Sequence, residues 1–210
     1  MLNEMNSVQE NRYDRIATAH NRMMNINGYR RSVAKMLARL DLGLSRDSLV
    51  LDAGCGTGMV TIGLKLSGFE LKQIVAADIS INSLRIARAE FKKRKGEQEM
   101  APLGGDVLNL PFADDTFNLI ITSGVLEHVP LDKGLAELTR VLKPSGRLII
   151  LPVRPSILGR LLESLYKFET YPVESVIHAA RRHLILKQTY DFPFYEPIGW
   201  SKLALVLEKP

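Results

Sequence analysis

The sequence predicts an α/β fold, a doubly wound, mostly parallel sheet with helices on both faces. The main observation is an alternation along the chain. Short apolar runs typical of buried strands are followed by segments in which apolar residues recur at helical spacing. Hydrophobic residues make up 46% of the 210 residues, which suits one compact domain, and no internal repeat or long linker divides the chain.

The first elements follow from local pattern. Apolar residues at i, i+3, i+4 and i+7 predict an amphipathic helix over 32–40. The run at 48–54 is expected to be a buried strand, followed by a glycine turn and a helix that ends between 66 and 68. A second buried strand is predicted at 73–78.

The middle of the chain continues the alternation. Ser80 is the expected N-cap of a helix that Gly96 ends. A short strand at 100–106 and a strong one at 117–123 come next. A helix then carries the apolar residues Leu135, Leu138, Val141 and Leu142.

The pattern changes in the last third of the chain. The segment 143–146, "KPSG", is expected to turn into a fifth strand at 147–153. Two further helices and two further strands are then predicted, at 156–168, 173–182, 184–190 and 201–209. The resulting division is an N-terminal helical cap (1–44), a core (45–152), a helical insert or lid (153–183) and a C-terminal strand pair (184–210).

Composition narrows the setting of the protein. The N-terminal residues lack the basic start and apolar centre of a secretory signal, and no apolar run is long enough for a membrane span. The single cysteine excludes an internal disulfide framework. A cytoplasmic location is therefore the expectation. The net charge of +5 is mildly basic, and its clearest run, 91–97, is interpreted as a solvated helix end.

The stretch "LVLDAGCGTGMV" (49–60) raises the question of a ligand. A dinucleotide fingerprint needs G-x-G-x-x-G, but Gly54, Gly56 and Gly58 give G-x-G-x-G, with Met59 in the third position. Asp52 would repel a pyrophosphate and favours a ligand that brings positive charge. S-adenosylmethionine does so with its sulfonium and amino groups, and its carboxylate can face the helix that begins near residue 57.

Two more acids end the following strands. Asp78 ends the second strand, where a carboxylate can accept hydrogen bonds from both ribose hydroxyls of a nucleoside. Its exposed strand end predicts that it takes part in no buried network. Asp106 ends the third strand, within reach of an adenine amino group. Three acids at successive strand ends are a stronger signal than the glycine turn alone.

Over about 45–152 the chain resembles the class I S-adenosylmethionine-dependent methyltransferases, which have a Rossmann-like fold. The matching segments are "VLDAGCGTG", "AADIS", "GDVLNLPFADDTFNLIITSGVLEHV" and "ELTRVLKPSGRLII". The resemblance implies seven strands with the last one antiparallel, a role that 201–209 fits. Asn118 stands where the family more often has aspartate, and we expect it to be structural.

The resemblance also implies roles for individual residues. Gly54 and Gly56 would contact the cofactor through the backbone, with Cys55 and Gly58 in the same turn. Asp78 would bind the ribose and Ile79 would pack on the adenine. The adenine edge would be read by Asp106 and the amide of Val107, while Ser123 would lie beside the methionine portion.

Two shorter matches indicate a small-molecule enzyme. "VLEHVP" (125–130) is similar to ubiquinone- and menaquinone-biosynthesis methyltransferases, and "RYDRIA" (12–17) to their N-terminal segment, in which Tyr13 would close over the cofactor. His128 is a candidate general base, since its unperturbed pKa suits the task and it follows the fourth strand. A structural role for His128 is the alternative.

Other chemistry is disfavoured. Cys55 is interpreted as a small side chain in a tight turn rather than a nucleophile. Glu127 and His128 are adjacent, share no helix face and have no third partner for a metal, so no metal site is expected. The place after the fourth strand lacks the Pro-Pro-aromatic segment of enzymes that methylate base amino groups.

The acceptor pocket is expected between the N-terminal segment and 153–183, whose apolar residues suit a small hydrophobic or aromatic acceptor. The same segment would also allow peripheral membrane contact. An RNA or protein methyltransferase that uses the basic surface, and a cofactor-binding protein without catalysis, remain alternatives. Monomer and homodimer are both compatible with the sequence.

Overall fold

The computed structural model describes residues 28–94, 98–154 and 170–210. These residues form one seven-stranded sheet in the order β3-β2-β1-β4-β5-β7-β6. Its strands are β1 Leu49–Ala53, β2 Gln73–Asp78, β3 Met100–Gly104, β4 Phe117–Ser123, β5 Leu142–Leu151, β6 Ile185–Tyr190 and β7 Ala204–Glu208. The strands β1 to β5 run parallel, whereas β7 is antiparallel to both β5 and β6. The predicted fold class is confirmed.

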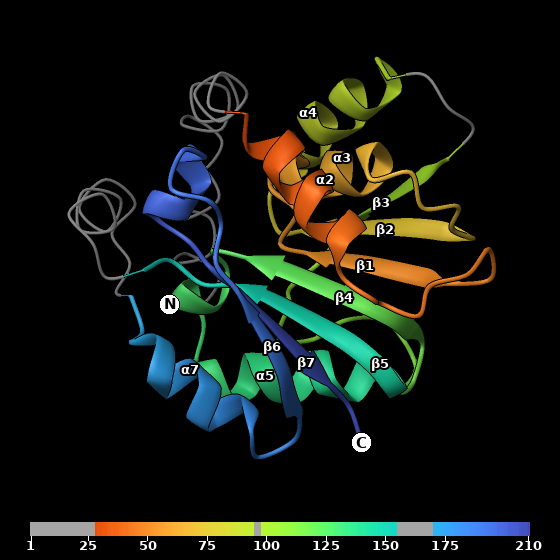
Figure 1. Cartoon of the computed structure of the whole chain (residues 1–210). Coiled ribbons are helices and arrows are strands. Elements are labelled where there is room, and N and C mark those ends of the chain that lie inside the picture. The colour runs from red at the N-terminus through yellow and green to blue at the C-terminus, as the bar shows by residue number, and fades with distance from the viewer. Residues whose placement is uncertain (1–27, 95–97, 155–169) are drawn as a thin grey trace.

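Helices cover both faces of this sheet (Figure 1). One face carries α2 Tyr29–Arg39, α3 Met59–Leu66 and α4 Ile81–Lys92, and the other carries α5 Leu131–Val141 and α7 Val173–Ala180. Two short 3₁₀ turns complete the described structure. The turn η1 Leu126–His128 follows β4, and the turn η2 Pro197–Trp200 precedes β7. No helix in the described ranges is long and apolar enough to span a bilayer.

The central strand β4 shows how the sheet separates two cores. Leu119 and Ile121 point to the core beneath α2 and α3, whereas Ile120 points to the core beneath α5 and α7. All three side chains are fully buried. Because successive residues of a strand face opposite sides, a parallel strand covered on both faces reads as an uninterrupted apolar run. This is why 117–123 could be predicted with its correct bounds.

Local signals also fixed the position of α4. The Ser80 hydroxyl accepts the backbone N–H of Ser83 at 3.0 Å, as expected of an N-cap. The expected end of this helix, Gly96, lies outside the described residues, and α4 ends at Lys92. The structural role expected of Asn118 is confirmed, because its Oδ1 accepts the N–H of Leu49 at 3.0 Å and joins β4 to the start of β1.

The segment "KPSG" differs from the expectation of a separate turn. It lies inside β5, where the pairing with β4 shifts between Phe117 and Leu119. Ser145 has a positive φ of 60° and donates its N–H to Lys209 O at 2.9 Å. The four residues therefore form an irregularity that β7 holds in the sheet, because the chain end supplies the hydrogen bonds that a free turn would lack.

The segment 153–183, predicted as a helical insert or lid, is described only in part. Its first expected helix, 156–168, lies wholly outside the described residues. The second is α7, whose Val176, Ala179 and Ala180 are buried in the core beneath α5. This helix packs against α5 and β6 and so belongs to the layer that covers this face of the sheet.

Candidate functional site

The glycine turn after β1 leaves one backbone position open. Gly54 has φ 71°, and a Cβ there would lie 2.1 Å from the Cγ2 of Val125, so no side chain fits. Gly56 has φ 50°, but a Cβ there would meet nothing within 4 Å. Gly58 caps α3, close to Ala87 of α4. The turn is thus closed at its first and last glycines and open at Gly56, where a ligand can approach the backbone.

Asp78 holds this turn in place. Its Oδ2 accepts the N–H of Gly56 at 2.7 Å and its Oδ1 accepts the N–H of Ser80 at 2.8 Å. Asp78 was expected to take part in no buried network, but it joins the turn and the start of α4 through these two part-buried hydrogen bonds. The strand end brings the carboxylate directly over the glycine turn, because β1 and β2 are paired in parallel from Leu49 onwards. A carboxylate oxygen has further lone pairs, so ribose binding remains compatible with these bonds.

Asp52 is buried beneath the glycine turn, although its place beside the glycines predicted that it would face a ligand. It is 1% exposed, and its Oδ2 accepts both the N–H of Thr61, at 2.8 Å, and the hydroxyl of Thr61. Burial raises the pKa of Asp52 to about 7, against the opposing effect of the Thr61 hydrogen bonds. Its role toward a positively charged ligand group stays a prediction.

Cys55 is a structural residue of the turn. Its backbone N–H donates to Ala77 O at 2.9 Å, and its side chain is buried with Ala76 and Leu84. Burial raises the pKa of the Cys55 thiol well above its ordinary value. Since a thiolate is the reactive form, this environment opposes nucleophilic chemistry.

Three residues expected at the nucleoside lie around the ends of β2 and β3. Ile79 directly follows Asp78 and is 46% exposed, an unusual state for an isoleucine and one that suits packing on a ligand ring. Asp106 accepts the N–H of Leu108 at 2.9 Å, which shapes the loop after β3. The Val107 side chain is buried in the core on the α5 face. Their contacts with an adenine stay predictions.

A hydrogen bond from α2 reaches the end of β4. The hydroxyls of Tyr29 and Ser123 lie 2.8 Å apart, although the residues are separated by 94 positions. Tyr29 is buried, which raises the pKa of its hydroxyl. The sequence pattern placed the helix start at residue 32 and so missed Tyr29. The wider apolar spacing of 29, 33 and 36 was the signal that could have found it.

Three ionisable residues lie in or near η1, just past β4. The Glu127 carboxylate accepts the N–H of Val153 at 2.8 Å. His128 ends η1 and is half-buried, and burial lowers the pKa of its imidazole. Lys202, from the connection between η2 and β7, is 6% exposed and donates to Leu151 O at 3.1 Å. Sequence reasoning missed Lys202, because nothing local to 200–204 relates it to β4.

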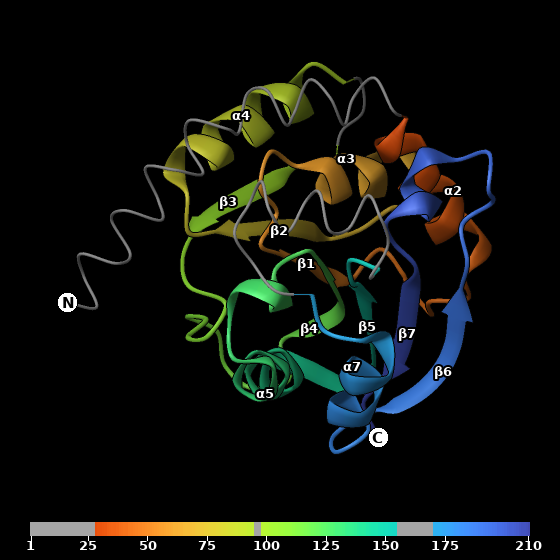
Figure 2. The same cartoon turned by 90° about the vertical axis from the view of Figure 1, so that its left-hand side faces the viewer.

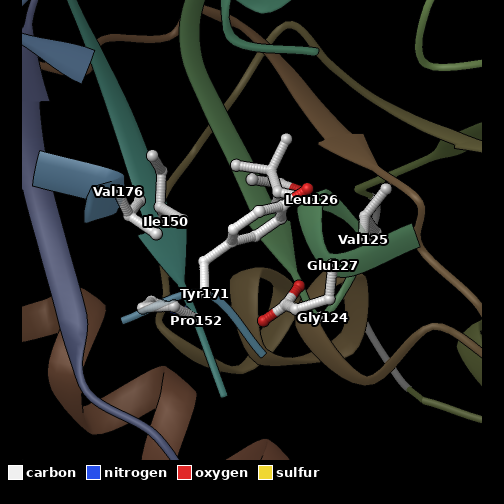
Figure 3. A pocket seen from close by; sticks show the side chains of 9 residues that line it. Gly124, Val125, Leu126, Glu127, Ile150, Pro152, Tyr171 and Val176 are labelled. Atoms are coloured by element: carbon white, nitrogen blue, oxygen red, sulfur yellow. The ribbon is translucent and has the colours of Figure 1, made fainter. Parts of the chain in front are cut away.

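A pocket opens beside these residues on the α5 face (Figure 3). Its empty space, including the open mouth, is about 240 Å³. Its lining is mainly apolar and consists of Thr122, Gly124, Val125, Leu126, Glu127, Ile150, Pro152, Tyr171 and Val176. Figure 3 shows the Tyr171 side chain reaching into the pocket, with Ile150 and Pro152 on one side and Leu126 on the other.

Figure 2 looks along the strands from the side toward which β4 and β5 point in Figure 1, and it shows the ends of the parallel strands facing the viewer along one edge of the sheet. The glycine turn and Asp78 lie at the ends of β1 and β2. Ser123, η1 and the pocket lie at the ends of β4 and β5. Tyr13 lies outside the described residues. In the described ranges, no group of three or more His, Cys, Asp or Glu residues could hold a metal ion.

Near the turn, two buried side-chain oxygens lack a hydrogen-bond partner, as expected where a polar cofactor would bind. Within the described part of the chain, the buried Asp52 Oδ1 and Thr57 Oγ1 have no hydrogen-bond partner. Both belong to the stretch that contains the open Gly56 position, and the exposed Ile79 follows the Asp78 carboxylate. The sheet is mostly parallel, a glycine turn follows β1, and an acid ends β2. This arrangement at the carboxyl ends of the strands is typical of α/β domains that bind a nucleoside cofactor.

Comparisons with known proteins agree with this class. Residues 51–150 match a family model described as a methyltransferase domain. A demethylmenaquinone methyltransferase of Thermobifida fusca is 39% identical over 54% of this chain and 48% of its own length. Another, from Staphylococcus haemolyticus, is 26% identical over 92% of this chain and 85% of its own length.

One solved structure shows a similar fold over most of the chain. The N-methyltransferase NodS of Bradyrhizobium japonicum, in complex with S-adenosylhomocysteine, superposes with a TM-score of 0.69 at 19% identity, covering 90% of this chain and 91% of its own. The present chain spans about half the length of two of the curated relatives that it matches.

Residues 51–150 are therefore a methyltransferase domain of the class I S-adenosylmethionine-dependent type. This match confirms the cofactor predicted from the charge and spacing of the glycine turn. Gly54, Gly56, Gly58, Asp52 and Asp78 meet at one turn, as expected. The individual cofactor contacts, and the role of His128, stay predictions.

Proposed function

We propose that the protein transfers a methyl group from S-adenosylmethionine to a small hydrophobic or aromatic acceptor by direct displacement. The observation that carries this proposal is the adjacency of two sites along one sheet edge. The open glycine turn and Asp78 lie at the ends of β1 and β2. The apolar pocket begins at Thr122 of β4, the strand next to β1, and at Gly124 just after it.

On the cofactor side, the chain supplies a rigid frame. When bound, S-adenosylmethionine supplies a methyl carbon already activated by its positively charged sulfur. Asp78 fixes the Gly56 amide and Ser80 starts α4, so the turn is shaped before a ligand arrives. Ser123, held by the Tyr29 hydroxyl, bounds the end of β4. Such preorganisation supports alignment of the reactants, which can account for about 7–11 kcal/mol of a barrier.

On the acceptor side, the pocket lining supports an apolar ligand with one polar group. Leu126, Ile150 and Val176 line its walls, while the Glu127 carboxylate and the Tyr171 hydroxyl are among its few polar groups. Both curated relatives described above are named for demethylmenaquinone, which supports an aromatic acceptor for this chain.

His128 is the proposed general base. Because burial lowers the pKa of its imidazole, the neutral form that can accept a proton dominates at neutral pH. A base is needed only where the acceptor must lose a proton. Asp52 and Cys55 are not assigned to proton transfer, since both are buried under the turn.

The test begins with ligand binding. S-adenosylhomocysteine should raise the melting temperature of the protein, because a ligand that binds only the folded state stabilises it, whereas NAD should not. A shift with NAD and none with S-adenosylhomocysteine would contradict the proposal.

Turnover is then measured as release of S-adenosylhomocysteine with small phenols and quinols, and separately with RNA and with protein. Turnover confined to RNA or protein, with an affinity that falls steeply with salt, would replace the small acceptor by a macromolecule.

A further inference from the structure

Lys202 places a buried cation at the edge of the proposed acceptor site. Its residue is 6% exposed, and its ammonium donates to the carbonyl oxygen of Leu151 at 3.1 Å. This is the one hydrogen bond that the described part of the chain gives to the ammonium. A lysine carries three donors, so two remain for a ligand or water. Burying a charge is costly, and such a charge commonly serves a function.

The position of the ammonium is fixed by the strand register. Leu151 is paired with Ser123, and Lys202 itself is bridged to Val153. A Cβ on Gly124 would lie 3.3 Å from the Lys202 Nζ, and Gly124 has a positive φ of 69°. The absence of a side chain at Gly124 therefore leaves the ammonium room at the end of β4, where the proposed methyl donor and acceptor meet.

The charges near Lys202 leave the ammonium unneutralised at short range. Burial lowers the pKa of the Lys202 ammonium, and the charge of Glu127 opposes this shift. The described residues contain no ion pair between the two, and Glu127 accepts the N–H of Val153. His128 also senses the ammonium, which helps to lower the pKa of its imidazole. Of these three residues Glu127 lines the pocket, and Lys202 lies beside Gly124, which also lines it. His128 and Glu127 both interact electrostatically with the ammonium.

We propose that the Lys202 ammonium binds the deprotonated hydroxyl oxygen of the acceptor, so that the site selects acceptors that carry an acidic phenol or enol. This inference rests on the proposed function, because it assumes an acceptor at the ends of β4 and β5. When the acceptor binds, its O–H bond breaks, the electron pair stays on oxygen and the proton passes to His128. The oxyanion then pairs with Lys202.

The size of the effect favours this role. A phenol with a pKa near 10 is ionised to about one part in a thousand at pH 7. An opposite charge at about 4–6 Å lowers a pKa by about 1–3 units, which would raise the ionised fraction about 10- to 1000-fold. A cation that only bonded a main-chain carbonyl would give no such preference for an ionised ligand.

The test uses 4-nitrophenol, whose ionised form absorbs in the visible, and 4-nitroanisole, its neutral ether. Both are titrated into protein saturated with S-adenosylhomocysteine. Wild type should bind the phenol at least about tenfold more tightly than the ether, and the bound phenol should show a stronger phenolate band than free 4-nitrophenol at the same pH. Lys202→Met should lose about 10- to 100-fold of the phenol affinity and keep that for the ether.

Three further variants control the result. Lys202→Arg should restore part of the phenol preference, because it restores the cation. Lys72→Met removes an exposed lysine from the opposite edge, before β2, and should change nothing. Should Lys202→Met fold poorly, Lys202→Gln takes its place, with the melting temperature as the check.

The inference is overturned if wild type binds phenol and ether equally, if it binds neither, or if Lys202→Met keeps the preference. Affinity for S-adenosylhomocysteine separates this failure from that of the proposed function. If wild type binds S-adenosylhomocysteine but shows no preference for the phenol, only the proposed role of Lys202 is wrong. If wild type binds no S-adenosylhomocysteine, the proposed function itself is wrong.

Discussion

At the ends of β1 and β2 the candidate residues come from two consecutive strand-turn units, whereas at the ends of β4 and β5 they come from distant segments of the chain. Asp78 and Gly56 are 22 positions apart and belong to consecutive strand-turn units. Tyr29 and Ser123 are 94 positions apart, and Lys202 and Leu151 are 51 apart. The first region is a local backbone device, and the second depends on the packing of α2 and the β7 connection. The motif shared with the methyltransferase family lies in the first region, and under the proposed function the choice of acceptor depends on the second.

The largest expected effect is a loss of stability when the glycine turn of the cofactor region is changed. Gly54→Ala should lower the free energy of unfolding by about 2–5 kcal/mol, because it adds overlap with Val125 to a strained positive φ. Gly56→Ala is the matched control, since its Cβ meets nothing and only the φ strain of about 1–2 kcal/mol applies. Denaturant unfolding of both variants measures the difference. Equal losses would mean that the turn is not closed by Val125.

The acceptor region is probed by His128. If it is the base, His128→Ala should lower the turnover rate by about 10²–10⁴-fold and leave the affinity for S-adenosylhomocysteine nearly unchanged. The rate is measured with an acceptor that must lose a proton, once one has been found. An unchanged rate would give His128 a structural role, and the same variant tested with an acceptor that is already ionised serves as the control.

Asp78 tests the cofactor region again. Asp78→Ala should weaken S-adenosylhomocysteine binding by roughly 2–4 kcal/mol, about 30- to 1000-fold. It should also lower stability by about 1–3 kcal/mol, because the amides of Gly56 and Ser80 lose their acceptor. Calorimetric titration and unfolding are measured on the same samples. Unchanged affinity would mean that the cofactor does not lie along the ends of β1 and β2.

Asp52 links the cofactor region to pH. The pKa of Asp52 rises from 3.8 to about 7 on folding, so the folded state binds more protons than the unfolded state between these values. Stability should therefore fall as the pH rises through this window, by roughly 1–3 kcal/mol for this group.

Asp52→Asn should remove that part of the slope, as measured by unfolding at pH 5 and pH 8. The exposed Asp47→Asn is the control. A slope that persists in Asp52→Asn would assign the pH dependence to another group.

The smallest effect concerns the contact that joins α2 to β4. Tyr29→Phe and Ser123→Ala each remove one side of a single hydrogen bond and should each cost about 0.5–1.5 kcal/mol of stability. The double variant should cost less than the sum, because both changes remove the same interaction. Additive losses in the unfolding measurement would show that the two hydroxyls are not coupled.

The sequence alone determined the sheet and the cofactor turn. Strands such as 73–78 and 117–123 are buried on both faces and therefore read as continuous apolar runs with clear ends. Ser80 capped α4 as expected, and the G-x-G-x-G spacing with Asp52 and Asp78 distinguished the cofactor from a dinucleotide. These features are local, so periodicity, capping and turn chemistry are sufficient to predict them.

Only the tertiary structure decided what surrounds the acceptor edge. The packing of α2 brought Tyr29 to Ser123, and the antiparallel return of β7 brought Lys202 beside Gly124. It also placed α7 under the sheet beside α5 and drew "KPSG" into β5. None of these contacts has a local sequence signature, because each depends on which strands pair and on how the chain returns to the sheet.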